Sequence, residues 1–230
     1  MYFSTRETSG TLQAFFNDGI LYTANAADVS AFIDFDVLAK HDTSVMNTCI
    51  FVGANVYIGD IGGSIAVFDK KLKKKSEIRL SNSPIWTIKV LDNTLYAGDE
   101  AGHVFVYDLL EKAVVMIDEK RLGIIDIFRY EEHVAVSSYD ESLIIYDSKS
   151  LRVISRHDKI GTLWKIVQKG NFIISSCIYQ GLKIFDLQFN VLETLETEAI
   201  CYAVCCTDTK LIWAPYYSGC IEWVEFDWNA

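Results

Sequence analysis

The sequence predicts an all-β fold, a WD-repeat-like β-propeller with six four-stranded blades. The main observation is an acidic residue that ends an apolar strand and recurs every 39 residues, at Asp69, Asp108, Asp147 and Asp186. One further step of 39 residues reaches Glu225, and a step of 35 residues back from the first acid reaches Asp34. Six similar units therefore fill the chain, and four antiparallel strands that recur at this period predict a β-propeller.

The strands inside each unit repeat as well. An apolar strand such as TCIFVG or WTIKVLD is followed by a second such as VYIGD or LYAGD, and the third ends on the acidic residue. These three strands are apolar nearly throughout, as expected when both sheet faces are covered. The fourth, such as SEIRLS, alternates like an exposed outer edge. The run LLEKAVVMIDEKRLGIIDIF resembles a helix by itself, but the 39-residue register assigns it to strands.

The repeat predicts one domain over residues 1–230. The last unit has three strands, and the strand-like segment at residues 1–8 is expected to add the fourth and close the ring, leaving no open sheet edge. The expected blades are residues 10–45, 46–83, 84–122, 123–161, 162–200, and 201–230 with 1–8.

Composition and charge narrow the possible partners. Half of the 230 residues are hydrophobic, so the chain can build a sizeable core. The net charge of −10 argues against nucleic acid as a partner. No apolar run reaches the roughly 18 residues of a membrane span, and the N-terminus lacks a signal-peptide pattern. We expect a cytoplasmic monomer without membrane contact. The basic run at residues 70–75 is either a solvated loop or a docking patch for an acidic partner.

The cysteines and histidines do not predict a metal or a cofactor. The chain has six cysteines and four histidines, with no CxxC pair and no zinc-site spacing. We therefore expect reduced thiols, no bound metal and no cofactor.

Aromatic and acidic residues are expected to gather at one mouth of the propeller channel. The innermost strand of a blade starts on the same face as the loop between its second and third strands. Trp86 and Trp164 start such strands two periods apart, and Tyr202 has nearly the same place in the last blade. The loops of that face carry Asp60, Asp99, residues 138–141, residues 177–179, Tyr216 and Tyr217. Such a mouth suits a quaternary ammonium group.

Structural alternatives exist for the same residues. Asp140 in a tight turn can bond the turn backbone, the tryptophans can be channel packing, and Cys177 can be a small buried hydrophobe. The chain has no GxSxG elbow, P-loop or dinucleotide fingerprint. By themselves, the residues indicate a binding scaffold.

Several strings over residues 84–227 resemble the WD-repeat diphthine methylesterases of diphthamide biosynthesis. That family carries a Ser-Tyr-Asp-Glu turn, which matches residues 138–141, and a Gly-Gly-Val-Trp-Arg type string one blade later, which resembles residues 161–165. Its Cys-Met-His-x-Gly-Phe-Lys type string is similar to residues 177–183. An earlier blade of the family starts its inner strand with a Trp and then carries a Tyr-Ser-Gly-Gly-Asp type turn, which match Trp86 and residues 96–99 here. The last blade of the family begins with a Tyr-Gly-Ala string, which resembles Tyr202 and Ala203.

The chain departs from the family in three ways. The family usually has seven blades, the paired glycines are reduced to Gly161, and the histidine of the third string is Tyr179 here.

The resemblance implies hydrolysis of the methyl ester on the diphthine intermediate of elongation factor 2, its protein substrate. Asp140, Glu141 and Asp99 are the candidate bases that would activate water. The candidate substrate-binding residues are Trp86, Tyr139, Trp164, Cys177, Tyr179, Tyr202 and Tyr217. The alternative function is a non-catalytic WD-repeat scaffold for protein–protein interaction.

Overall fold

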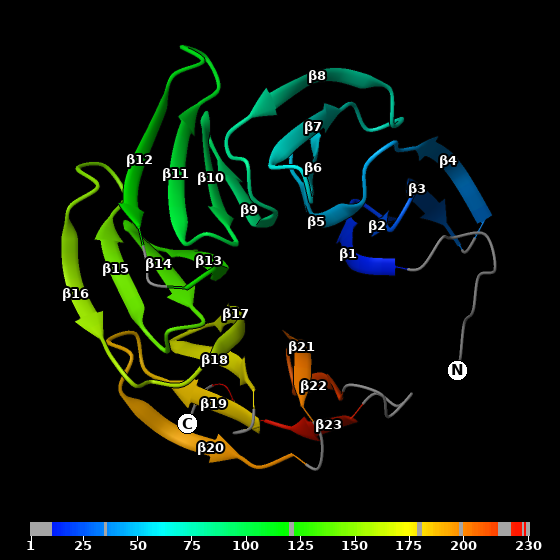
Figure 1. Cartoon of the computed structure of the whole chain (residues 1–230). Coiled ribbons are helices and arrows are strands. Elements are labelled where there is room, and N and C mark those ends of the chain that lie inside the picture. The colour runs from blue at the N-terminus through cyan, green and yellow to red at the C-terminus, as the bar shows by residue number, and fades with distance from the viewer. Residues whose placement is uncertain are drawn as a thin grey trace. The chain divides into compact units, whose positions relative to one another are not determined.

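The computed structural model is built from β-strands (Figure 1). It describes residues 11–34, 36–119, 122–178, 181–197, 200–215, 222–226 and 228. These residues form six antiparallel sheets, five of four strands and one of three, in which neighbouring strands follow one another along the chain. The fold is a six-bladed β-propeller, as the sequence predicts. The predicted closing strand at residues 1–8 lies outside the described residues.

The chain divides into two compact units, residues 1–124 and 125–230. The first unit holds three sheets, each a meander of four strands. Their strands are β1 (Thr11–Asn17), β2 (Ile20–Asn25), β3 (Asp28–Ile33), β4 (Asp36–Asp42), β5 (Asn47–Val52), β6 (Val56–Asp60), β7 (Ser64–Phe68), β8 (Lys74–Arg79), β9 (Ile85–Leu91), β10 (Thr94–Asp99), β11 (His103–Asp108) and β12 (Val114–Glu119).

The second unit holds the other three sheets, and its last sheet has three strands within the described residues. Its strands are β13 (Ile124–Tyr130), β14 (His133–Ser138), β15 (Leu143–Asp147), β16 (Val153–His157), β17 (Leu163–Lys169), β18 (Phe172–Cys177), β19 (Gly181–Phe185), β20 (Val191–Leu195), β21 (Cys201–Cys206), β22 (Lys210–Pro215) and β23 (Glu222–Glu225). The run that resembles a helix forms β12 and β13, which confirms the register prediction.

The repeated acidic residue holds the turn between the third and fourth strands. In four blades its Oδ1 accepts two backbone N–H groups of the turn, at Asp69, Asp108, Asp147 and Asp186. The N–H of Lys73 is the first cause that holds the pKa of Asp69 below its ordinary value. Each turn also contains one residue with a positive φ: Leu72 (58°), Lys112 (55°), Leu151 (57°) and Phe189 (61°). The 39-residue period is therefore the spacing of one structural turn.

Apolar side chains of successive sheets pack together within each unit. In the first unit, one cluster joins β2, β3, β5 and β6, and a second joins β5 to β7 with β9 to β11. Gly98 of β10 lies in close contact with Ile124, the last residue of the first unit, since a Cβ built there would lie 2.3 Å from Cγ2 of Ile124. The fourth strands β4, β8, β16 and β20 are mostly exposed, which agrees with their predicted position at the outer edge.

Buried polar groups also join successive blades. In the second unit, Asp126 of β13 is 2% exposed, and its Oδ2 accepts the backbone N–H of Ile166 on β17 at 2.9 Å. The hydroxyl of Ser137 on β14 donates to the carbonyl of Leu163 on β17 at 2.9 Å. In the first unit, the amide of Asn47 on β5 donates to the carbonyl of Asn25 on β2 at 2.7 Å. These hydrogen bonds fix the register between neighbouring sheets.

Candidate functional site

Asp99, a candidate base, is enclosed in the first unit. It ends β10 and has no exposed surface. Its Oδ1 accepts the backbone N–H of His103 at 2.8 Å. Its Oδ2 accepts the hydroxyl of Ser81 at 2.5 Å and lies 2.8 Å from Nδ1 of His103. Both carboxylate oxygens therefore have protein partners.

The contacts among Ser81, Asp99 and His103 do not form a nucleophile relay. In a Ser-His-Asp triad the imidazole lies between the hydroxyl and the carboxylate, so that it can take the serine proton. Here the carboxylate lies between the other two and bonds both. This arrangement holds the β10–β11 turn against the segment before β9.

Trp86, the candidate cation-binding residue of the first unit, is the second residue of β9 and is partly buried. Its indole N–H donates to a carboxylate oxygen of Glu100, in the turn after β10. The carboxylate thus occupies the polar edge of the indole, and only the ring face remains for a ligand.

Asp140 and Glu141 lie in the β14–β15 turn of the second unit. Oδ1 of Asp140 accepts the backbone N–H of Ser142 at 3.0 Å, and the N–H of Asp140 donates to the hydroxyl of Ser138 at 3.3 Å. This is the turn-stabilising hydrogen bond expected from the structural alternative. Glu141 has a φ of 63° and is exposed to solvent.

Tyr139 and Trp164 meet between the β14–β15 turn and β17. Their ring centroids are 5.7 Å apart with an interplanar angle of 72°, an edge-to-face contact. Both side chains are partly buried. The structure therefore brings together two of the predicted binding residues, which lie 25 positions apart in the sequence.

The other predicted binding residues line no pocket within the described residues. Cys177 ends β18 with no exposed surface, and burial raises the pKa of its thiol to about 11. Tyr202 belongs to β21, but its side chain lies outside the described part of the chain. Tyr179 and Tyr217 lie wholly outside it. The five described cysteines are free thiols, and the described residues contain no group of three or more His, Cys, Asp or Glu side chains able to hold a metal ion.

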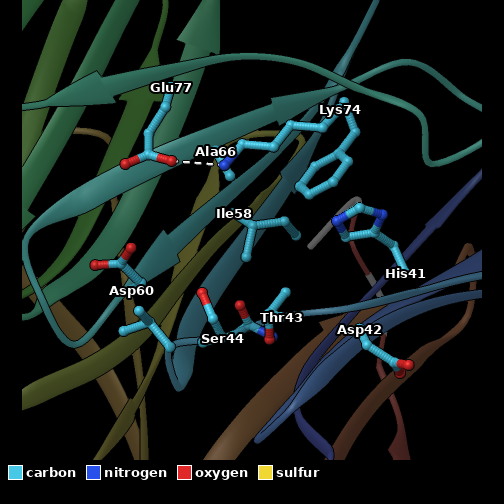
Figure 2. Close-up of a pocket in the computed structure, with 12 residues that line it drawn as sticks. His41, Asp42, Thr43, Ser44, Ile58, Asp60, Ala66, Lys74 and Glu77 are labelled. Atoms are coloured by element: carbon cyan, nitrogen blue, oxygen red, sulfur yellow. Dashed lines mark hydrogen bonds and ion pairs between the residues drawn. The ribbon is translucent and has the colours of Figure 1, made fainter.

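A cleft that the sequence analysis did not predict lies between the first two sheets (Figure 2). We call it the interblade cleft. Its volume is about 180 Å³, and its walls come from β4, the β4–β5 connection and strands β5 to β8. The lining residues are His41, Asp42, Thr43, Ser44, Val45, Asn47, Ile58, Asp60, Ala66, Phe68, Lys74 and Glu77.

The interblade cleft has a mixed lining, in which the apolar side chains of Val45, Ile58, Ala66 and Phe68 adjoin the charged side chains of Asp42, Asp60, Lys74 and Glu77. Figure 2 shows Ile58 in the middle of the cleft, with Lys74 and Glu77 along one side and Thr43 and Ser44 along the other. Nζ of Lys74 lies 2.6 Å from Oε2 of Glu77, and this ammonium is the first cause that holds the pKa of Glu77 below its ordinary value.

Comparisons with known proteins identify the fold and no family. No family model matches the chain, and no curated protein matches it. A chain in the crystal structure of the mitotic checkpoint complex superposes with a TM-score of 0.78 at 9% identity, covering 98% of this chain and 83% of that one. The computationally designed Ika8 protein gives a TM-score of 0.74 at 14% identity, and the superposition covers 93% of this chain and 70% of Ika8. BamB from Moraxella catarrhalis gives a TM-score of 0.69 at 14% identity, and the superposition covers 93% of this chain and 71% of BamB.

At these identities the likeness shows the propeller fold alone. The resemblance to diphthine methylesterases stays a prediction. No helix within the described ranges is long and apolar enough to cross a membrane.

Proposed function

We propose that this chain is a protein-binding β-propeller without hydrolytic activity. The observation that carries the proposal is the use of the turn carboxylates. Oδ1 of Asp60, Asp99 and Asp140 each accepts a backbone N–H of its own turn, from Ser64, His103 and Ser142. Carboxylates that repeat from blade to blade in one structural role do not form a catalytic set.

The described serine–histidine contacts also favour binding over hydrolysis. Oγ of Ser155 and Nε2 of His157 are 3.4 Å apart on β16, an outer strand with mostly exposed side chains. A nucleophile and its base normally lie 2.6–3.2 Å apart beside donors for the oxyanion. An exposed outer strand has no enclosing walls that could exclude water from a developing charge.

Reconstitution tests this proposal. Proteins retained by the immobilised chain from its own cells are expressed separately, purified and mixed with the purified chain. We expect at least one to form a complex of defined stoichiometry that survives gel filtration. The proposal fails if no retained protein re-forms a complex from purified components.

The Tyr139–Trp164 contact favours a second candidate function, hydrolysis of the methyl ester of diphthine on elongation factor 2. Two aromatic rings at an angle suit the trimethylammonium group of that substrate, and the exposed Glu141 lies two residues after Tyr139 in the same turn. Water would add to the ester carbonyl, methanol would leave, and the free carboxylate would remain. Glu141 is then the candidate base, because Asp140 holds its own turn.

A further inference from the structure

We propose that the interblade cleft and the lysine turn at residues 70–75 together dock an acidic peptide segment of a partner protein. We call this turn the basic turn. An apolar side chain of the segment enters the cleft, and flanking carboxylates bind the lysines. The inference rests on the proposed binding function and specifies its surface and the chemistry of its partner.

The basic turn has a fixed conformation. Oδ1 of Asp69 accepts the backbone N–H groups of Lys71 and Lys73, both at 2.9 Å. Leu72 between them is 3% exposed and belongs to the core cluster of β2, β3, β5 and β6. Because the turn is anchored by a buried side chain and by a carboxylate, its lysines are displayed on an ordered support. Binding to such a support costs less conformational entropy than binding to a mobile loop.

The ammonium groups of the basic turn are accessible to an acidic ligand. Lys75 donates to the side-chain carbonyl of Asn55 at 2.8 Å, a neutral partner. Lys70 lies 3.9 Å from the exposed carboxylate of Asp18. Lys71 and Lys73 are exposed and form no ion pair with any described residue. Exposed pairs of this kind are worth about 0–1 kcal/mol, so a ligand carboxylate can replace them.

Lys74 connects the basic turn with the interblade cleft. It begins β8, and its side chain runs along the cleft toward Glu77 (Figure 2). Val45, which is 41% exposed, supplies apolar contact surface at the cleft, above the buried side chains of Ile58 and Phe68. A cleft of about 180 Å³ has room for one large side chain, whereas drug-sized ligands need about 300 Å³ or more.

The charge distribution favours an acidic peptide over a longer polyanion. The whole chain carries a net charge of −10, while the basic turn concentrates five lysines in six residues. Surface potentials decay over about 8 Å at physiological salt. The carboxylates of a short acidic segment that lie over residues 70–75 therefore experience mainly the field of these lysines, while Asp42, Asp60 and Glu77 of the cleft favour an uncharged side chain there. Nucleic acid or an anionic membrane would extend over the acidic surface around the basic turn.

Fluorescence anisotropy tests the lysines. The probe is a labelled peptide with Asp and Glu residues around one central leucine, titrated with the full chain at about 0.15 M salt, where distant charges are screened. Lys71→Glu/Lys73→Glu should weaken binding about 10-fold or more, since close charge pairs become repulsive. The matched control is Lys149→Glu/Arg152→Glu, which changes net charge equally in the corresponding turn of the fourth blade and should leave affinity within about 2-fold. Circular dichroism verifies that both variants fold.

A second pair of measurements tests the cleft. Ser44 is exposed and lines the cleft, so Ser44→Trp should block it and weaken binding of the leucine peptide. Replacing the leucine of the peptide by serine should weaken binding to the wild-type chain and abolish the effect of Ser44→Trp. The inference is wrong if both changes leave affinity unaltered, or if both charge-reversal variants weaken binding equally.

Three further outcomes decide between this inference, other polyanions and the proposed function. A single-stranded oligonucleotide or a phosphatidylserine vesicle that binds through Lys71 and Lys73 more tightly than the peptide overturns the inference. If the peptide does not bind and a reconstituted partner still does, the docking surface is wrong and the binding function stands. If no partner reconstitutes, the proposed function fails whatever the peptide does.

Discussion

Asp126 should be among the most stabilising polar residues of the second unit. It is 2% exposed, and its Oδ2 accepts the N–H of Ile166 at 2.9 Å and lies 3.5 Å from Nζ of Lys165. Asp126→Ala would leave the N–H of Ile166 buried without an acceptor, which costs about 1–3 kcal/mol. It would also remove the Lys165 pair, whose lysine is about one-third exposed and adds at most about 1 kcal/mol. We expect a loss of about 1–4 kcal/mol in the free energy of unfolding.

Guanidinium unfolding followed by far-ultraviolet circular dichroism measures this loss. A destabilisation of that size corresponds to a fall of about 2–16 °C in Tm for a chain of this length. Asp126→Asn should show a smaller loss, because the amide oxygen can still accept the Ile166 N–H. Asp208→Ala is the control, since Asp208 forms an exposed pair with Lys169 at 2.7 Å and its removal should barely shift the midpoint. Equal midpoints for Asp126→Ala and Asp208→Ala would refute the role of Asp126 as an interblade link.

Three other predictions concern packing, pH and the β14–β15 turn. Gly98→Ala should lower the free energy of unfolding by about 1–3 kcal/mol in the same assay, because the new methyl group overlaps Ile124. An unchanged midpoint would contradict the close contact between Gly98 and Ile124. Burial raises the pKa of Cys177 from 9.0 to about 11, so the stability due to its protonated thiol is present below pH 9 and declines as pH rises toward 11. Cys177→Ala should therefore flatten the dependence of the unfolding free energy on pH between pH 9 and about 11. An unaltered slope would contradict the raised pKa of this thiol. Asp140→Ala should cost about 1 kcal/mol through loss of the Ser142 N–H acceptor, whereas Asp140→Asn should be nearly neutral; equal losses would show that the charge itself stabilises the turn.

The fold was predictable because its repeat depends on local chemistry. Asp69 and its equivalents accept N–H groups two to four residues further along the chain, so the same residue type is needed once per blade. That constraint gives the sequence a visible period. The apolar strands and the exposed fourth strands follow from burial alone, and both agree with the structure.

The sites were less predictable because they depend on contacts between sheets. Asp126 bonds a residue 40 positions away, and no local pattern distinguishes it from an ordinary strand residue. Ser81 and His103 flank Asp99 from two different segments, so the sequence indicated a free carboxylate where the structure has a saturated one. The interblade cleft combines side chains from β4 to β8 and from the β4–β5 connection, and the sequence indicated only Asp60 and the lysine run among them as candidates.

Catalysis is the property that most directly separates the two functions left open by the sequence. The decisive measurement is the intact mass of elongation factor 2 bearing the diphthine methyl ester, incubated with a substoichiometric amount of the purified chain. Mild alkaline hydrolysis of the same substrate serves as the positive control for detecting the loss of one CH₂. Our account predicts that the mass stays unchanged while the alkaline control shifts. A loss of one CH₂ over many turnovers, abolished by Glu141→Gln or Trp164→Ala, would contradict the binding function and establish the esterase.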